Sequence, residues 1–375
     1  MSTTNTLHLS SAGLPMSKKP LLVCGPCSAE SEAQMLETAQ GIAEYFPEAI
    51  FRAGIWKPRT RPNSFEGMGS IGLPWLKSVK EQTGLTIATE VANATHVEEC
   101  LKAGVDILWI GARTTVNPFY VQEIADSLKG IDIPVFVKNP IHPDLQLWIG
   151  ALERLNSSGI TRLAAVHRGF HTYDNTPFRN APKWDMVIEL KSLFPELPII
   201  CDCSHICGNT EMIPYVAQKA MDLDLDGLMI ETHRNPKVAL SDAKQQVTPF
   251  QLYEIISALR IRDAFSENEE FKNQLTLLRD NISIADDEIL QMLAHRMSMV
   301  KNIAAYKRDN NVTILQVNRW KELLKTQMHN GETLGLSKEF VKQLYLLVHD
   351  ESIRIQAEIM NVEAEIVKSK SEILK

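Results

Sequence analysis

Eight short apolar runs mark the first two thirds of the chain, and stretches with helical periodicity separate them. Each run holds five to eight residues and is rich in apolar and β-branched side chains, as buried strands are. The first run starts at residue 21 and the last at residue 227, so successive runs start about 29 residues apart. The runs are LLVCG (21–25), AIFRAG (49–54), LTIATE (85–90), ILWIGA (107–112), PVFVKN (134–139), LAAVHR (163–168), PIICDCSH (198–205) and GLMIETH (227–233).

This spacing fits a strand and a helix, repeated eight times. Eight such units predict an α/β fold, specifically a (β/α)8 TIM barrel. An open, doubly wound sheet is the alternative, and it would normally carry a glycine-rich phosphate-binding turn after its first strand. The sequence at that point is GPCS (25–28), which does not match such a turn. The barrel is therefore the favoured interpretation.

The last third of the chain has a different pattern. All 18 prolines lie at or before Pro249, and only Gly331 and Gly335 of the 18 glycines lie beyond it. Apolar residues then recur three and four positions apart, at Leu275, Leu278, Ile282, Ala285, Ile289, Met292, Met299 and Ile303. This pattern predicts one long helix between residues 266 and 311 with a single apolar seam. We predict a barrel domain at 1–265 and an all-α domain of three helices at 266–375.

Charge and composition narrow the class of protein. The chain is 44% hydrophobic with a net charge of −7, so it has no general attraction to nucleic acid. The sequence contains no run of 18 apolar residues, so it predicts no membrane span. The first 20 residues lack the apolar core that a secretion signal would have. We therefore expect a cytoplasmic protein. Its six cysteines are expected to be reduced thiols rather than disulfides.

Charged side chains occur at almost every strand end of the predicted barrel, where the active sites of such barrels form. A ring of like charges is costly without a counter-ion, so these cations predict an anionic ligand that carries phosphate, carboxylate or both. The cations are Arg52, Lys57, Arg59, Arg113, Lys138 and Arg168, and Glu90 ends the third run.

A second set of strand-end residues could bind a metal ion. Cys27, His205, Glu231 and Asp242 offer one thiol, one imidazole and two carboxylates. Such a set suits manganese, iron, cobalt or zinc better than magnesium. No short motif with metal-ligand spacing supports it, and a buried thiol or a hydrogen-bonded structural histidine remains the alternative for its members.

Several motifs resemble the 3-deoxy-D-arabino-heptulosonate 7-phosphate (DAHP) synthase family over residues 20–260. This family condenses phosphoenolpyruvate with erythrose 4-phosphate. In it, the element KPRT (57–60) contacts the aldose phosphate, whereas the sister octulosonate 8-phosphate synthases usually differ there. The resemblance therefore favours erythrose 4-phosphate over arabinose 5-phosphate. The motifs are GPCSAES (25–31), RAGIWKPRTRPNSFEGMG (52–69), IGAR (110–113), VKNP (137–140), CDCSH (201–205), IETHRNP (230–236) and ALSD (239–242).

The resemblance implies a role for each matching residue. It implies a divalent metal, Mn²⁺ first with Fe²⁺, Co²⁺ and Zn²⁺ as alternatives, bound by Cys27, His205, Glu231 and Asp242. It implies that phosphoenolpyruvate is held by Arg52, Arg113, Lys138 and Arg168. It implies that erythrose 4-phosphate is held by Lys57, Pro58, Arg59 and Thr60, and that Glu90 orients a water. Lys57 and Lys138 are also expected to take part in catalysis.

Polar residues interrupt two apolar faces in the C-terminal domain. Arg296 stands between Met292 and Met299 in the seam of the long helix, and Ser352 and Gln356 lie one turn apart on an otherwise apolar face. An arginine in a seam is either paired or extended to solvent. The alternative is a cation that lines an internal anion site.

These positions coincide with a second resemblance, to the all-helical (AroQ-type) chorismate mutases, over residues 268–362. The matching motifs are LLRDNI (277–282), HRM (295–297), AAYKRDN (304–310), NRW (318–320) and DESIRIQ (350–356). The resemblance implies a site formed by Arg279, Arg296, Lys307, Arg319, Ser352 and Gln356. The sequence departs from the family at Gln316 and Trp320, where Asp and Glu are frequent.

Relatives of this helical type are intertwined dimers, which implies a homodimer through residues 266–375 in which Arg279 completes the partner's site. The sequence as a whole predicts a bifunctional enzyme with phosphoenolpyruvate, erythrose 4-phosphate and chorismate as substrates. Prephenate is expected as a product and as a feedback inhibitor of the synthase. The alternative is that the C-terminal helices are a regulatory and dimerisation module with little mutase turnover.

Overall fold

The computed structural model describes residues 7–10, 19–57, 65–173, 176–263 and 265–373. The chain divides into two compact units, Met1–Ala264 and Phe265–Lys375, and each is described by itself. No helix within the described ranges has both the length and the apolar character needed to cross a bilayer.

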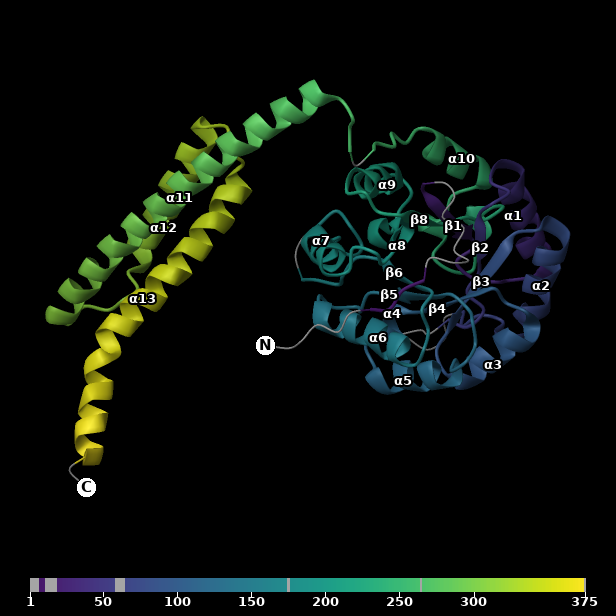
Figure 1. Cartoon of the computed structure of the whole chain (residues 1–375), viewed down its shortest axis with the longest axis horizontal. Coiled ribbons are helices and arrows are strands. Elements are labelled where there is room, and N and C mark those ends of the chain that lie inside the picture. The colour runs from purple at the N-terminus through teal and green to yellow at the C-terminus, as the bar shows by residue number, and fades with distance from the viewer. Residues whose placement is uncertain (1–6, 11–18, 58–64, 174–175, 264, 374–375) are drawn as a thin grey trace. The chain divides into compact units, whose positions relative to one another are not determined.

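The first unit is a closed barrel of eight parallel strands in sequence order, so the predicted TIM barrel is confirmed (Figure 1). The strands are β1 (Leu21–Gly25), β2 (Ile50–Arg52), β3 (Thr86–Val91), β4 (Ile107–Ile110), β5 (Val135–Lys138), β6 (Leu163–His167), β7 (Ile199–Asp202) and β8 (Gly227–Glu231). The helices around them are α1 (Glu32–Tyr45), α2 (Gly72–Thr83), α3 (Ala94–Ala103), α4 (Ala112–Thr115), α5 (Pro118–Ser127), α6 (Leu145–Ser157), α7 (Trp184–Leu193), α8 (Cys203–Cys207), α9 (Ile213–Asp222) and α10 (Pro249–Ser257). Short 3-10 turns lie at η1 (Gly69–Ile71), η2 (Pro236–Val238) and η3 (Ala243–Gln245).

Both faces of the sheet are buried, which explains why the strands appear in the sequence as continuous apolar runs. In β1, Leu21 and Val23 belong to the cluster inside the barrel, whereas Leu22 and Cys24 pack in the layer between strands and helices. Trp109 and Phe136 are the largest side chains of the inner cluster. The barrel interior is thus a packed core.

Gly25 ends β1 with a φ of +143°, a backbone conformation that L side chains rarely adopt. A Cβ at this position would lie 2.1 Å from the backbone oxygen of Arg52. Glycine therefore lets the turn after β1 pass directly against the end of β2. This contact brings Cys27 and Arg52 to the same part of the barrel mouth.

The seventh strand is shorter than the sequence pattern indicated. The apolar run was expected to continue to His205, but β7 ends at Asp202 and the short helix α8 follows. The Asp202 carboxylate accepts a hydrogen bond from the His205 backbone N at 3.2 Å and so caps α8. His205 consequently lies in the first turn of a helix and not on a strand.

Residues 7–10 are attached to the N-terminal end of the barrel. The His8 backbone N donates to Asn156 Oδ1, and Asn156 Nδ2 donates to the His8 oxygen, both at 2.8 Å. The Ser10 backbone N donates to the Thr161 oxygen at 3.0 Å. Thr161 and Asn156 precede β6, so this segment lies at the end opposite to the loops that follow the strands.

The second unit consists of α11 (Glu269–Asp309), α12 (Val317–Thr333) and α13 (Lys338–Ile373), and α13 packs against both other helices (Figure 1). The predicted long helix is α11, and the Asn268 side chain caps its start by accepting from the Phe271 backbone N. Close packing of α12 on α13 depends on Gly331, where a Cβ would lie 2.4 Å from Val341 Cγ2.

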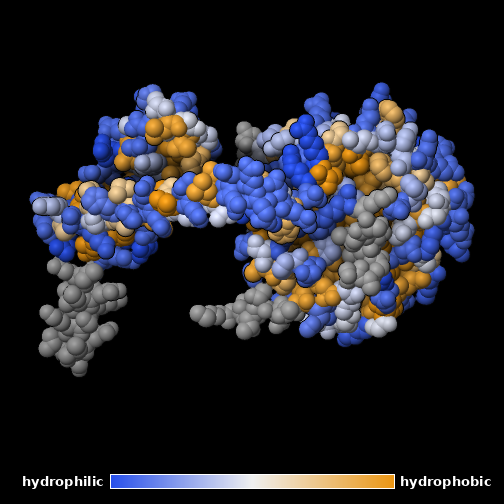
Figure 2. All heavy atoms as spheres, turned by 45° about the horizontal axis from the view of Figure 1, so that its top comes forward, coloured by the Kyte–Doolittle hydropathy of each residue, from blue (hydrophilic) through white to orange (hydrophobic). Residues whose placement is uncertain are grey.

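The apolar seam read from the sequence is not the face of α11 that packs within the chain. Val300 and Ala304 are the buried residues of this helix, whereas Ile282, Ile289 and Met292 are each more than half exposed. Apolar side chains accordingly appear on the surface of this unit in Figure 2.

Candidate functional site

A cavity of about 630 Å³ opens at the C-terminal ends of the strands. It contains most of the cations predicted from the sequence, and it also exposes two of the predicted metal ligands. Its lining residues are Lys57, Glu90, Gly111, Ala112, Arg113, Lys138, Ile141, Arg168, His171, Arg179, Asn180, His205 and Asp242. Pro58, Arg59 and Thr60, which were predicted to bind the aldose phosphate, lie outside the described residues.

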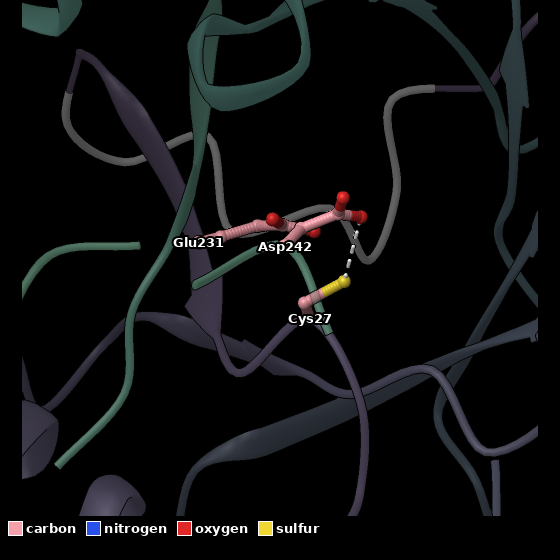
Figure 3. A group of neighbouring side chains, drawn as sticks. All are labelled: Cys27, Glu231 and Asp242. Atoms are coloured by element: carbon pink, nitrogen blue, oxygen red, sulfur yellow. Dashed lines mark hydrogen bonds between the residues drawn. The ribbon is translucent and has the colours of Figure 1, made fainter. Parts of the chain in front are cut away.

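Three of the four predicted metal ligands form a compact group. One ligand atom each from Cys27, Glu231 and Asp242 lies within 4.8 Å of the others (Figure 3). Cys27 comes from the turn after β1 and Glu231 from the end of β8, and Cys27 Sγ lies 3.4 Å from Asp242 Oδ2. Asp242 has a left-handed backbone, φ 45°, immediately before η3. The ends of two neighbouring strands, β1 and β8, and a loop residue with a left-handed backbone thus converge on one point.

His205 is the fourth predicted ligand and lies beside this group. Its Nδ1 is 3.0 Å from Asp202 Oδ1, and its Nε2 is 3.8 Å from Glu231 Oε1. Burial lowers the pKa of His205 although Asp202 opposes this shift. A neutral imidazole that donates from Nδ1 to Asp202 leaves the Nε2 lone pair directed toward Glu231. Histidines that bind metals are commonly oriented by a carboxylate in this way.

The electrostatics of the group fit a divalent cation. Burial, together with the charge of Glu231, raises the pKa of Cys27 to about 11, and Lys57 opposes this with its Nζ 3.1 Å from the sulfur. Burial also disfavours the charged form of Asp242, yet Arg179 and other cations hold its pKa below the usual value. Sulfur, imidazole and carboxylate donors together suit Mn²⁺, Fe²⁺, Co²⁺ or Zn²⁺. The residues present therefore fit such an ion.

Two buried cations at strand ends, Arg52 and Lys138, are paired with carboxylates. Arg52 Nη1 is 2.7 Å from Glu231 Oε1, and Lys138 Nζ is 2.7 Å from Asp202 Oδ2. The guanidinium carbon of Arg52 and the Lys138 nitrogen lie 4.8 and 5.8 Å from the ring centroid of Trp109. Arg52 is therefore held against the metal group, and Lys138 is held below the opening.

Arg168 and Arg113 supply further positive charge at the rim. Burial lowers the pKa of Arg168 to about 10, with Asp202 opposing and Arg179 and Arg113 adding to the shift. A guanidinium that burial and neighbouring cations destabilise gains most from a bound anion. Glu90 faces the same cavity and accepts a hydrogen bond from Trp109 Nε1 at 3.1 Å.

Sequence reasoning missed several residues that shape the site. Asp202 stands at a strand end within the quoted motif CDCSH, so its position could have identified it. Arg179 donates to Asp242 Oδ1 at 3.0 Å and to Gln245 Oε1 at 2.8 Å, and Gln245 in turn donates to Glu231. Arg179 and Asn180 lie in a loop without periodicity, and no sequence signal marks them.

The second unit brings together three of its six predicted site residues. Arg296 Nη1 donates to Ser352 Oγ at 2.6 Å, and Gln356 Nε2 donates to the backbone oxygen of Ser352, one turn earlier on α13, at 3.1 Å. Gln356 Oε1 is buried and has no hydrogen-bond partner among the residues that the structure describes. An arginine, a hydroxyl and an amide oxygen thus form one polar patch between α11 and α13.

The other three predicted residues are not part of this patch. Lys307 Nζ donates to the Ile314 oxygen at 2.5 Å, and Arg319 is 71% exposed with Glu322 at 3.7 Å. Arg279 is exposed on α11, about 25 Å along the helix from Arg296. One chain therefore does not bring Arg279 to the patch. Trp320, a departure from the family pattern, stacks on His349 with ring centroids 3.9 Å apart.

The fold and the two polar sites define a TIM-barrel enzyme with a cavity lined by cations beside a candidate metal centre, followed by a helical domain. Residues 15–263 match the model of the DAHP synthetase I family, and the chain belongs to this family. Residues 278–357 match the chorismate mutase type II model. Both family resemblances inferred from the sequence motifs are thereby confirmed.

Individual relatives match the barrel. A phospho-2-dehydro-3-deoxyheptonate aldolase of Thermotoga maritima is 30% identical over 232 residues, which are 62% of this chain and 66% of the relative. The chain thus spans slightly less than two thirds of that protein. A 2-dehydro-3-deoxyphosphooctonate aldolase of Vesicomyosocius okutanii is 27% identical, with 67% of this chain and 93% of the relative covered. The crystal structure of the Thermotoga maritima DAHP synthase aligns with a TM-score of 0.58 and 27% identity, covering 64% of this chain and 67% of the other.

Proposed function

We propose that the barrel condenses phosphoenolpyruvate with erythrose 4-phosphate to DAHP and phosphate, and that the helical domain rearranges chorismate to prephenate. The observation that carries the first activity is the cationic cavity beside Cys27, Glu231 and Asp242 in a chain of the DAHP synthetase I family. The family match of the helical domain and its Arg296–Ser352 contact support the second.

In the barrel, fixed cations hold two anionic substrates in reacting geometry. Arg113, Lys138 and Arg168 bind the phosphate and carboxylate of phosphoenolpyruvate, while Lys57 faces the acceptor from the metal side of the cavity. Arg59 and Thr60 hold the acceptor's phosphate. Positioning and preorganised charge provide most of the rate enhancement, because Asp202 holds Lys138 and Asn180 holds Arg168 before substrate arrives.

The metal centre and Glu90 serve the acceptor carbonyl and the water. Cys27, His205, Glu231 and Asp242 hold the divalent ion, Mn²⁺ in the first instance. When bound, the ion supplies a Lewis acid for the aldehyde oxygen of the acceptor. Arg52 holds Glu231 in place through their 2.7 Å contact. Glu90, fixed by Trp109, orients the water that adds to the enol carbon.

Consumption of phosphoenolpyruvate by the purified full chain tests the barrel reaction. Turnover with erythrose 4-phosphate is expected, and it should disappear after chelation and return when manganese is added. Because an octulosonate aldolase is also among the relatives, arabinose 5-phosphate is tested alongside. Preference for arabinose 5-phosphate would transfer the proposal to that reaction, and no turnover with either aldose under any metal would refute it.

In the helical domain, catalysis needs neither acid nor base. Arg279 from a partner chain, Arg296 and Arg319 bind the two carboxylates of chorismate, and Ser352 supports Arg296. Lys307 and Gln356 stabilise the charge that grows on the ether oxygen. Wild-type protein should form prephenate, and Arg296→Ala should abolish this rate. If the wild type binds chorismate without turnover, the helices are a regulatory module instead.

The exposed seam of α11 supports a homodimer of this unit. Ile282, Ile289 and Met292 are exposed in the single chain, and Arg279 is too far from Arg296 to serve its own chain. Light scattering should give a dimer for the wild type and a monomer for Ile289→Asp. Ile188→Asp, a change of the same kind at a half-exposed residue of α7, is the control. A fully active monomeric wild type would contradict the dimer.

Fusion of the two domains supports feedback, with prephenate bound at the helices lowering synthase activity. A synthase rate that saturating prephenate leaves unchanged would exclude this regulation. We place the protein in the cytosol, which is consistent with six buried, unpaired thiols.

A further inference from the structure

Asn180 lies between the phosphate side and the metal side of the cavity wall. Its side chain is buried, with 5% exposed. Asn180 Oδ1 accepts a hydrogen bond from Arg168 Nη1 at 3.0 Å, and Asn180 Nδ2 donates to the His205 backbone oxygen at 2.6 Å. One amide group therefore contacts both a rim cation and the segment that carries a candidate metal ligand.

The loop after β6 is folded so that Asn180 reaches this position. Phe170 and Ala181 exchange two backbone hydrogen bonds of 2.8 Å, which join the two ends of the loop. Gly169, with a φ of +73°, lies against Asn180, and a Cβ there would be 2.7 Å from the Asn180 oxygen. The Asn180 backbone N also donates to the Ile206 oxygen at 3.1 Å. Asn180 thus contacts the two residues that follow β6 on one side and α8 on the other.

Asn180 helps to fix the position of both of its partners, Arg168 and the His205 backbone. Among the described residues, the guanidinium of Arg168 makes one other hydrogen bond, a longer contact of 3.4 Å to the Gly169 oxygen. The bond to Asn180 therefore sets the orientation of Arg168. Helix α8 has only five residues, and a helix this short is not stable by itself. Its first turn is fixed by the Asp202 cap and by the contact between Asn180 and the His205 oxygen.

We propose that Asn180 is a positioning residue that couples the phosphate-binding cation Arg168 to the metal ligand His205. This inference rests on the proposed function, which assigns those two roles. Asn180 is uncharged, so its replacement alters geometry without altering the charge of either site. Loss of its amide should therefore weaken phosphoenolpyruvate binding and metal binding together.

The test uses Asn180→Ala and Asn180→Leu. Leucine keeps a side chain branched at Cγ, as in asparagine, so the result does not depend on one variant folding. Mn²⁺ binding to the metal-free full chain is measured by electron paramagnetic resonance without substrate. The KM for phosphoenolpyruvate is measured at saturating Mn²⁺ and erythrose 4-phosphate. We expect Mn²⁺ affinity to fall about 10-fold. We expect the KM to rise about 10-fold, as for loss of a hydrogen bond to a charged group.

Asn156→Ala is the matched control. Asn156 also uses its side chain to hold backbone groups, those of His8 and Ile160, but at the opposite end of the barrel. This variant should melt at a lower temperature while both binding constants stay at wild-type values. The control thereby shows what a purely structural role produces.

Three results would overturn the inference: unchanged Mn²⁺ affinity and KM in folded Asn180 variants, a shift of only one of the two constants, or the same shifts in Asn156→Ala. The Mn²⁺ titration requires no turnover, so it separates this inference from the proposed reaction. A wild type that binds Mn²⁺ but consumes no phosphoenolpyruvate refutes the reaction. If the wild type shows full turnover and the Asn180 variants keep its Mn²⁺ affinity and KM, the coupling alone is refuted.

Discussion

Replacing Asp202 by asparagine removes a carboxylate that holds two functional groups at once. Asp202 is fully buried, and Lys138 Nζ lies 2.7 Å from its Oδ2 while His205 Nδ1 lies 3.0 Å from its Oδ1. Burial alone would raise the pKa of Asp202, but His205 and Lys138 hold it well below its usual value. Asparagine has nearly the same shape and offers one acceptor oxygen in place of two.

The expected cost follows from this geometry. Removing one member of a buried ion pair costs about 3–5 kcal/mol, and the remaining acceptor places Asp202→Asn at the lower end, about 3 kcal/mol. At about 2–4 °C per kcal/mol for a unit of this size, the melting temperature should fall by about 6–12 °C. Because the folded-state pKa is depressed, the carboxylate's contribution is complete above its unfolded pKa of about 4 and is lost as the pH falls below it. The difference should therefore be the same at all pH values above about 5.

Thermal unfolding followed by circular dichroism, with a chelator present so that metal binding does not contribute, measures this difference. Asp226→Asn is the control. Asp226 directly precedes β8, at the end of the barrel away from the cavity, and its carboxylate accepts a hydrogen bond from the Ile199 backbone N at 2.9 Å. The nearest cations to Asp226, Lys19 and Lys191, lie 3.7 and 3.9 Å away. Loss of the Asp226 charge should therefore lower the free energy of unfolding by about 1 kcal/mol. If Asp202→Asn melts no lower than Asp226→Asn, the Lys138–Asp202–His205 arrangement does not stabilise the barrel as we argue.

Three further changes have definite expectations. Gly25→Ala should cost more than about 4 kcal/mol or prevent folding, because its Cβ would meet the Arg52 oxygen at 2.1 Å; a wild-type melting curve would contradict this. Gln356→Leu removes a buried, unpartnered oxygen and should raise stability by about 1 kcal/mol while abolishing prephenate formation, and a destabilised, active variant would refute it. Burial, and to a smaller extent the charge of Arg168, lowers the pKa of His167 to about 3. Below about pH 6.5 the unfolded chain therefore takes up a proton at this histidine, whereas the folded chain does not. His167→Phe should therefore gain about 2 kcal/mol on the wild type between about pH 7 and 5 in urea unfolding, and a constant difference would exclude this.

The barrel could be predicted from sequence because its strands are buried on both faces. Burial on both sides produces continuous apolar runs, and their regular spacing leaves few other folds. The prediction was less accurate where a side chain changes the local structure. Asp202 ends β7 by capping α8, and the apolar residues Cys203, Ile206 and Cys207 follow so soon after the strand that the sequence pattern does not mark this boundary. Periodicity also identified α11 but could not tell which face packs in the chain, since Val300 and Ile289 both belong to apolar rows.

The site was predictable to the extent that barrel geometry determines it. Strand ends meet at one mouth, so Cys27, Glu231 and Lys138 could be grouped before any coordinates were known. Arg179 and Asn180 could not, because their contacts depend on how a loop folds back onto α8 and η3. Such contacts follow from side-chain hydrogen bonds between distant residues, and these have no period in the sequence. Arg279 lies far from Arg296 along α11, and its role in a partner's site, which the family resemblance implies, stays a prediction because apolar periodicity does not show it.

The attachment of residues 7–10 has a practical consequence for handling the protein. His8 and Ser10 are bonded to the end of the barrel that lies away from the cavity. An affinity tag or surface linker joined ahead of this segment would therefore attach the protein through the end of the barrel opposite to the cavity. The barrel itself then does not turn its cavity entrance toward the support. Immobilised through this end, the enzyme could be supplied with substrate by flow and stripped of metal on the support. The metal titration and the turnover assay could then be run on a single sample.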